Sequence, residues 1–171
     1  IADSVGLGKT FLGLRFLDDY AYKLRQKALV VCPAQLRDSL WRPILEKYRI
    51  FTVMRSHEEV SQSDFPYAEF GDCDWVLVDE SHNFRNTSAN RYDNLMRVLT
   101  SGKPKKLILM TATPVNNSVF DLYNQVRFIT RDKDDALDEA GIPSLWGYFL
   151  RADIYGGDLY DLLEEISVRR T

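Results

Sequence analysis

The sequence predicts an α/β fold in which a parallel sheet carries helices on both faces. Three apolar runs of strand length, at 28–32, 74–78 and 105–110, are separated by segments whose apolar residues have helical spacing. Continuous apolar runs, rather than alternating ones, are typical of strands buried on both sides. Strands that alternate with helices favour parallel pairing through crossover connections. With 171 residues, a single domain spanning 1–171 is expected.

The elements follow one another in a regular order. From Gly8 to about Lys27 the apolar residues form one broad side of a helix, and the strand at 28–32 ends at Pro33. The later expected elements are a helix at 35–48, a strand at 51–54, a loop with one turn of helix at 56–73, the strand at 74–78, a helix at 90–100, the strand at 105–110 and a mostly helical extension at 118–171.

The composition excludes several classes of protein. The apolar fraction of 45% and the charged fraction of 27% are ordinary for a globular domain, and no apolar run has the length of a membrane span. The two cysteines do not suggest a disulfide framework, and no Cys/His cluster has the spacing of metal ligands. We therefore expect an intracellular protein without a membrane partner, in a compartment that the sequence does not specify.

Charge is distributed unevenly along the chain. The net charge is −3, yet residues 131–171 hold five basic and ten acidic side chains, so the preceding part is slightly basic. A nucleic-acid contact is therefore expected on residues 1–130, although the charge alone does not require one.

The segment Asp3-Ser4-Val5-Gly6-Leu7-Gly8-Lys9-Thr10 is a candidate phosphate-binding loop. The Lys9 ammonium would contact the outer phosphates, and the Thr10 hydroxyl would bind Mg²⁺. The strict pattern has glycine at the position of Asp3, and a chance turn is the alternative. Such a loop follows a buried strand, which we expect upstream of this segment. The expected phosphate contacts come from the backbone N–H groups of Val5, Gly6, Leu7, Gly8, Lys9 and Thr10.

A second candidate is the acidic pair Asp79 and Glu80, directly after the strand at 74–78. Two carboxylates at a buried strand end need a positive partner, which a loop-bound magnesium–nucleotide complex would supply. Asp79 would then hold the metal, while Glu80 would orient and deprotonate the attacking water. The alternative is an acidic pair that caps the next helix.

Two hydroxyl residues, Thr111 and Thr113, follow the third strand. Because the carboxyl ends of parallel strands lie at one edge of the sheet, these hydroxyls can hydrogen-bond to the segment 79–82. The pattern Thr-x-Thr-Pro is weak alone, and the order of loop, acidic strand end and hydroxyl strand end makes it informative.

Together these motifs resemble the first RecA-like lobe of superfamily 2 helicases and translocases, and within them the Swi/Snf-like branch. The similar segments are 3–10 (motif I), 29–35 with Trp41 (motif Ia), 79–82 with Arg85-Asn86 (motif II), 111–117 (motif III) and 168–171, which resembles the end of that lobe. This chain departs from the family pattern in having Ser4 for glutamate and Ala112 for glycine. The family's motif Ib is not placed.

The resemblance implies an ATP hydrolase that acts on double-stranded DNA with ATP and Mg²⁺. It implies that Lys9, Asp79 and Glu80 are catalytic. The coupling residues would be His82, Thr111 and Thr113, and the DNA contacts Pro33, Ala34, Gln35 and Arg85. A second RecA-like lobe is expected to supply arginines that raise the rate of hydrolysis by a factor of about 10³–10⁵. The chain alone is therefore expected to bind ATP weakly and hydrolyse it very slowly.

Two other functions stay open, a helicase that separates the strands of RNA or DNA, and a nucleotide-dependent scaffold with a decayed site, which only Asp3 and Ser4 favour. Several other residues are expected to have structural roles only. The three tryptophans, Trp41, Trp75 and Trp146, are expected in the core, Cys32 as a small hydrophobe, His57 as an exposed side chain and Arg85 alternatively as part of a surface ion pair.

Overall fold

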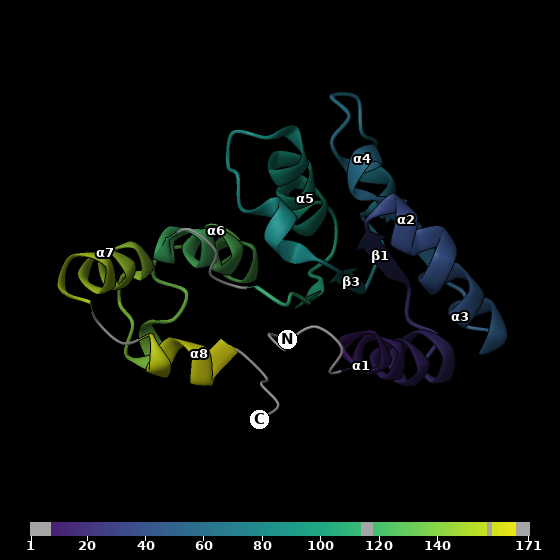
Figure 1. The fold of residues 1–171 in the computed structure, drawn as a ribbon, viewed down its shortest axis with the longest axis horizontal. Coiled ribbons are helices and arrows are strands. Elements are labelled where there is room, and N and C mark those ends of the chain that lie inside the picture. The colour runs from purple at the N-terminus through teal and green to yellow at the C-terminus, as the bar shows by residue number, and fades with distance from the viewer. Residues whose placement is uncertain (1–7, 114–117, 157–158, 167–171) are drawn as a thin grey trace.

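The computed structural model describes residues 8–113, 118–156 and 159–166. In this part of the chain the predicted parallel sheet is present, with four strands in the order β2-β1-β3-β4. Two of these strands, β1 and β3, are labelled in Figure 1. The strands are β1 (Ala28–Cys32), β2 (Val53–Ser56), β3 (Trp75–Val78) and β4 (Lys106–Leu109). Every residue of β1 is buried, as expected for a central strand whose continuous apolar run faces helices on both sides.

The helices alternate with the strands, as the sequence predicts. The first helix, α1 (Lys9–Phe16), continues in the π-helical turns of η1 (Leu17–Lys23) and ends four residues before the predicted Lys27. The other described helices are α2 (Ala34–Leu36), η2 (Arg37–Trp41), α3 (Arg42–Lys47), α4 (His57–Val60), η3 (Tyr67–Phe70), η4 (Ser81–Phe84), α5 (Asn90–Thr100), α6 (Val119–Thr130), η5 (Asp138–Ala140), α7 (Leu145–Tyr155) and α8 (Tyr160–Ile166).

Two hydrophobic cores lie on opposite faces of the sheet. Side chains alternate along a strand, so Leu29 and Val31 face one core while Val30 and Cys32 face the other. The first core is covered by α4, η3, α5 and part of α6, and the second by α1, η1, η2 and α3. In Figure 1, α5 and α1 lie on opposite sides of the strands. The prediction of helices on both faces is therefore confirmed.

The C-terminal helices α6, α7 and α8 form a third core of their own, beside the sheet (Figure 1). Leu122, Phe149 and Leu162 are among its buried residues. The prediction that Trp146 lies in the core is wrong, because this residue is 47% exposed and packs against the rings of Phe120 and Tyr123 at the surface.

The segment after α3 differs from the prediction. The strand was expected at 51–54, but β2 begins two residues later, and Phe51 is 89% exposed. The stretch 56–73 contains the expected turn of helix, α4, and a second short helix, η3, that was not expected. Ser56 ends β2 and also caps α4, since its hydroxyl accepts a hydrogen bond from the Glu59 N–H. The Ser-x-x-Glu pattern of this capping box is visible in the sequence itself.

Gly13 lies where α1 packs closely on side chains of the second core. A Cβ at this position would lie 2.9 Å from Trp41, 3.0 Å from Met110 Sδ and 3.1 Å from Leu77 Cδ1. Glycine costs helix stability, so its presence here reflects packing.

We expect Gly13→Ala to lower the free energy of unfolding by about 1–3 kcal/mol through overpacking, despite the better helix propensity of alanine. Chemical denaturation of both proteins measures this difference. Gly147→Ala is the control for helix propensity: Gly147 is half-buried in α7, and the nearest atom to its added Cβ is the Ser144 hydroxyl at 3.1 Å. A Gly13→Ala variant that is as stable as the parent would contradict the packing argument.

Candidate active site

The candidate site lies at the carboxyl edge of the sheet, beside the start of α1. Gly8 precedes α1 in a left-handed conformation with φ of 84°, which favours glycine, and Lys9 and Thr10 form the first turn. The first N–H groups of a helix lack intrahelical partners and attract anions. Val5, Gly6 and Leu7 lie outside the described residues, so their predicted phosphate contacts remain predictions.

One cavity joins the first and second predicted motifs. Its volume is about 340 Å³, and Lys9, Thr10, Asp79 and Glu80 all line it, although about seventy residues separate the two pairs in the chain. The fold therefore brings together a cation, a hydroxyl and two carboxylates. The remaining wall consists of Gly8, Phe11, Leu36, Leu40 and Ile44.

Asp79 is a buried carboxylate, 4% exposed, held at both oxygens. The Trp41 indole N–H donates to Oδ2 at 2.9 Å, and the Glu80 backbone N–H donates to Oδ1 at 3.0 Å. Burial raises the pKa of Asp79 above its usual value, because desolvation disfavours the ionised form, while these donors and the positive charge of Lys9 oppose the shift. A cation bound in the cavity would further favour the ionised carboxylate.

Glu80 adopts a left-handed backbone conformation, with φ of 50° and ψ of 49°. For a residue with a Cβ this costs about 1–2 kcal/mol, and such conformations persist where surrounding contacts fix them. The next N–H, that of Ser81, donates to the Met110 carbonyl at 2.9 Å, and the Asn83 amide donates to the Glu80 carbonyl at 3.1 Å. The turn directs the chain from β3 into η4.

The three predicted coupling residues lie close together beside Glu80. His82 Nδ1 is 3.3 Å from Glu80 Oε2 and 3.1 Å from Thr111 Oγ1. The same Thr111 oxygen accepts a hydrogen bond from the Thr113 N–H at 3.1 Å. One histidine ring therefore lies between the segment that follows β4 and the Glu80 carboxylate.

The predicted DNA contacts lie at two separate places. Pro33, Ala34 and Gln35 follow β1 at the carboxyl edge, and the Gln35 side chain is exposed. Arg85 is turned toward α6 instead, with Nε 3.8 Å from Asp121 Oδ1 and Nη1 donating to the His82 carbonyl. This arrangement agrees with the alternative that Arg85 forms an ion pair at the surface, whereas the exposed Gln35 is accessible to a ligand.

Sequence reasoning missed three contributions to the site. Trp41 was expected in the core, where it is fully buried, but its hydrogen bond from the indole N–H to Asp79 was not expected. The prediction that His57 is exposed is wrong: the side chain is 3% exposed, and burial lowers its pKa to about 4. Leu36, Leu40 and Ile44, spaced four apart, form an apolar wall that this spacing alone marks as one helix face.

The oxygen atoms that the described residues offer in this cavity suit a magnesium ion as ligands. Mg²⁺ prefers oxygen ligands and is usually held by one or two protein groups together with substrate phosphates. The Asp79 carboxylate and the Thr10 hydroxyl line the same cavity and offer that set. The described part of the chain holds no cluster of three or more histidine, cysteine, aspartate or glutamate side chains suited to a metal.

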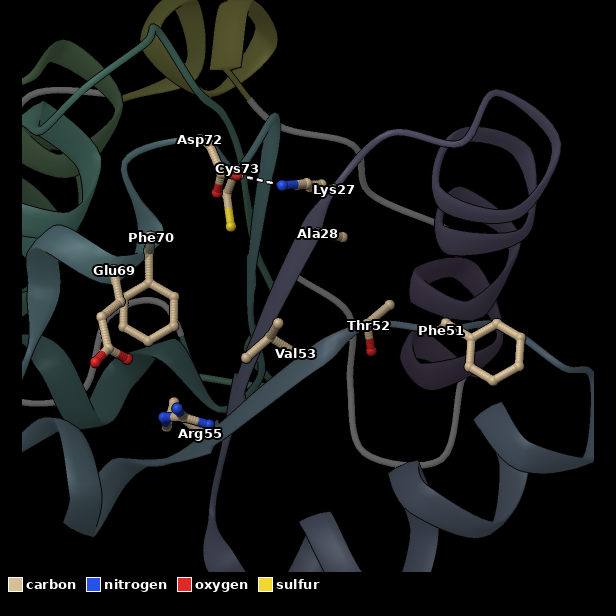
Figure 2. A pocket seen from close by; sticks show the side chains of 10 residues that line it. All are labelled: Lys27, Ala28, Phe51, Thr52, Val53, Arg55, Glu69, Phe70, Asp72 and Cys73. Atoms are coloured by element: carbon tan, nitrogen blue, oxygen red, sulfur yellow. Dashed lines mark hydrogen bonds and ion pairs between the residues drawn. The ribbon is translucent and has the colours of Figure 1, made fainter.

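A larger hollow, of about 560 Å³, lies at the opposite edge of the sheet (Figure 2). It is lined by Phe51, Arg55 and Phe70 among others, and the Lys27–Asp72 ion pair closes one side. It contains none of the predicted site residues. Cys73 lies there, whereas Cys32 is buried in the sheet with the pKa of its thiol raised to about 12 by desolvation, as expected for an inert small hydrophobe.

Within the described residues, no helix combines the length and the apolar character that crossing a membrane requires.

The parallel sheet, its helices on both faces and the clustering of motifs at its carboxyl edge define a RecA-like α/β lobe. The family model for the SNF2-related domain matches residues 47–138, more than half of the chain. The chain therefore belongs to the SNF2-related domain family, which confirms the resemblance to Swi/Snf-like lobes. The matched region contains the acidic pair and the two threonines but not Lys9.

Sequence matches to individual proteins point to the same family. The chain is 27% identical over 145 residues to the uncharacterized ATP-dependent helicase YqhH of Bacillus subtilis, covering 75% of this chain and 25% of that protein. It is 26% identical over 160 residues to a cattle (Bos taurus) protein named as a SWI/SNF-related, matrix-associated, actin-dependent regulator of chromatin, covering 75% of this chain and 15% of the relative. The chain thus spans a quarter or less of the length of these relatives.

A solved structure shares the fold. The Sulfolobus solfataricus SWI2/SNF2 ATPase core in complex with double-stranded DNA superposes with a TM-score of 0.70 at 20% identity, covering 99% of this chain and 39% of the other. At 20% identity this match is evidence for a shared fold alone.

Proposed function

We propose that the chain is the ATP-binding and ATP-hydrolysing motor lobe of a Swi/Snf-like translocase that moves along double-stranded DNA. The observation that carries the proposal is the single cavity shared by Lys9, Thr10, Asp79 and Glu80. Family membership supports it, and so do relatives whose names state ATP-dependent helicase activity. Residues 1–171 form one lobe in this proposal, with 118–171 as its helical extension.

The residues divide the chemistry among them. The N-terminal turn of α1 and the Lys9 ammonium bind the phosphates of ATP, and Thr10 and Asp79 hold Mg²⁺. When bound, the metal neutralises charge on the phosphate oxygens. Glu80 orients the attacking water and accepts its proton, and the left-handed turn at this residue sets the direction of its carboxylate.

The other parts of the motor lie outside this cavity. We propose that Pro33, Ala34 and Gln35 contact the DNA backbone, with Arg85 as a further candidate, and that His82, Thr111 and Thr113 couple DNA to the nucleotide. A second RecA-like lobe of the same polypeptide supplies the arginines that complete the transition-state contacts. The relatives that are chromatin regulators support an intracellular protein.

Duplex stimulation of ATP hydrolysis tests the proposal. In the complete polypeptide, double-stranded DNA should raise the rate of phosphate release far more than single-stranded DNA or RNA of the same length does. The chain 1–171 alone should stay near the background rate, since a catalytic arginine is worth about 10³–10⁵ in related enzymes. Stimulation by single strands, with strand separation, would favour the helicase alternative. ATP binding without hydrolysis in the complete polypeptide would favour the nucleotide-dependent scaffold.

A further inference from the structure

The ladder of backbone hydrogen bonds between β1 and β3 ends at a position where β1 has no N–H donor. In the parallel register Val31 pairs with Val78, and the Asp79 N–H donates to the Val31 carbonyl at 2.8 Å. The next bond of this ladder would run from the N–H of residue 33 to the Asp79 carbonyl. Residue 33 is proline, which has no N–H, so β1 cannot satisfy this buried carbonyl.

A histidine from the neighbouring strand end supplies the missing donor. His57 Nε2 lies 2.9 Å from the Asp79 carbonyl oxygen, and because a carbonyl only accepts, Nε2 carries the hydrogen. His57 follows β2, whose last residue, Ser56, pairs with Cys32 at the end of β1. The imidazole therefore reaches across the end of β1 to β3.

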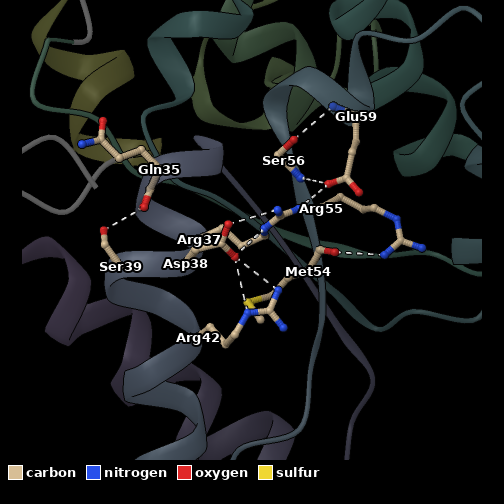
Figure 3. A network of polar contacts seen from close by, with 9 residues as sticks. All are labelled: Gln35, Arg37, Asp38, Ser39, Arg42, Met54, Arg55, Ser56 and Glu59. Carbon is tan, nitrogen blue, oxygen red and sulfur yellow. Dashed lines mark hydrogen bonds and ion pairs between the residues drawn. The ribbon is translucent and has the colours of Figure 1, made fainter.

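The His57 ring is held firmly in this position. It packs edge to face on Phe84, with ring centroids 4.9 Å apart. Its backbone belongs to the capping box of α4, in which Glu59 Oε2 accepts from the Ser56 N–H at 2.5 Å and from Arg37 Nη1 at 2.8 Å (Figure 3). The ring itself therefore packs on η4, while its backbone starts a helix whose cap is tied to β2 and η2.

The carbonyl that His57 binds belongs to the peptide unit that joins Asp79 to Glu80. That peptide unit sets the backbone on which Glu80 adopts its left-handed conformation, and the hydrogen bond fixes its plane. A conformation that is intrinsically unfavourable needs such contacts to stay populated. Without the bond, the carbonyl would be buried without a donor, and relief would require the peptide to rotate.

We infer that His57 is a positioning residue for the acidic pair, which replaces the hydrogen bond that Pro33 removes and thereby fixes the direction of the Glu80 carboxylate. The inference rests on the proposed function for its kinetic consequence, and on the geometry alone for its structural one. His57 does not reach the nucleotide cavity, whose lining does not include it.

Two variants of the complete polypeptide test the role. His57→Phe keeps a ring against Phe84 but has no donor, whereas His57→Gln places an amide nitrogen at the same number of bonds from the backbone as Nε2. With duplex DNA, His57→Phe should lower kcat by about ten- to a hundredfold, as expected for a misdirected catalytic group, and leave KM for ATP nearly unchanged. His57→Gln should restore most of kcat. Circular dichroism checks that both variants fold.

Amide hydrogen exchange provides a readout that needs no hydrolysis. The Glu80 and Ser81 amides should exchange about tenfold faster in His57→Phe than in the parent and regain protection in His57→Gln. If the parent showed no duplex-stimulated hydrolysis, the proposed function would fail while exchange still decided the positioning role. Unchanged kcat and exchange in His57→Phe, or equal defects in two folded variants, would overturn the inference.

Discussion

Replacing Glu80 with glutamine in the complete polypeptide should leave ATP binding intact and lower kcat for hydrolysis by about 10²–10⁴-fold. Glutamine keeps the size of the side chain and can still accept a hydrogen bond, but it cannot take a proton from water. Steady-state phosphate release with saturating duplex DNA, together with titration of a fluorescent ATP analogue, separates the two effects.

Glu69→Gln is a matched control for the Glu80 experiment. Glu69 is exposed on η3 and lines the hollow at the opposite edge of the sheet, so the same chemical change there should leave both binding and turnover unaltered. If Glu80→Gln hydrolysed ATP at the rate of the parent, Glu80 could not be the general base, whatever the family pattern suggests.

Lys9→Ala should produce the complementary defect. The ammonium at the first turn of α1 lines the cavity beside Asp79 and Glu80, where it would bind the negatively charged phosphates. Hydrogen bonds between charged groups contribute roughly 1.5–3 kcal/mol, so the affinity for ATP should fall about ten- to a hundredfold, with hydrolysis lost at ordinary concentrations. Titration of the same fluorescent analogue measures the affinity.

The control for Lys9 is Lys133→Ala, since Lys133 is exposed beyond the end of α6. That variant should bind the analogue as the parent does. The contrast with Glu80→Gln is informative: Lys9→Ala should fail to bind, whereas Glu80→Gln should bind without turnover. Equal affinity of Lys9→Ala and the parent would remove Lys9 from the phosphate site.

Local pattern was sufficient to predict the strands of the sheet and its parallel pairing. The run at 28–32 became β1 at its predicted bounds, and those at 74–78 and 105–110 became β3 and β4. Such predictions succeed because a continuous apolar run has no polar face to expose and must lie between two layers. The weaker strand at 51–54 was misplaced because β2 lies at the edge of the described sheet and pairs there with β1 alone. Half-exposed residues such as Val53 give such a strand little hydrophobic pattern.

The structure also corrected two single residues, His57 and Trp146. Both corrections concern side chains whose burial depends on distant segments rather than on their neighbours in sequence. His57 is buried by Phe84 and by the end of β3, and Trp146 is left half-exposed because the C-terminal helices bury other side chains in their core. Polarity in the surrounding sequence misled in the first case, and an apolar neighbourhood misled in the second.

The sequence by itself determined the chemical groups of the site and their order, because Gly8, Lys9, Asp79 and Thr111 lie at strand and helix ends that a parallel sheet brings to one edge. Tertiary structure decided how those groups are held. The indole of Trp41 on Asp79, the left-handed turn at Glu80 and the imidazole of His57 on the Asp79 carbonyl depend on contacts across 22 or more positions or on a backbone torsion. Neither distant contacts nor torsions leave a periodic trace in sequence. The missing N–H of Pro33 was visible there, but the partner that replaces it became apparent only when β1, β2 and β3 were aligned in register.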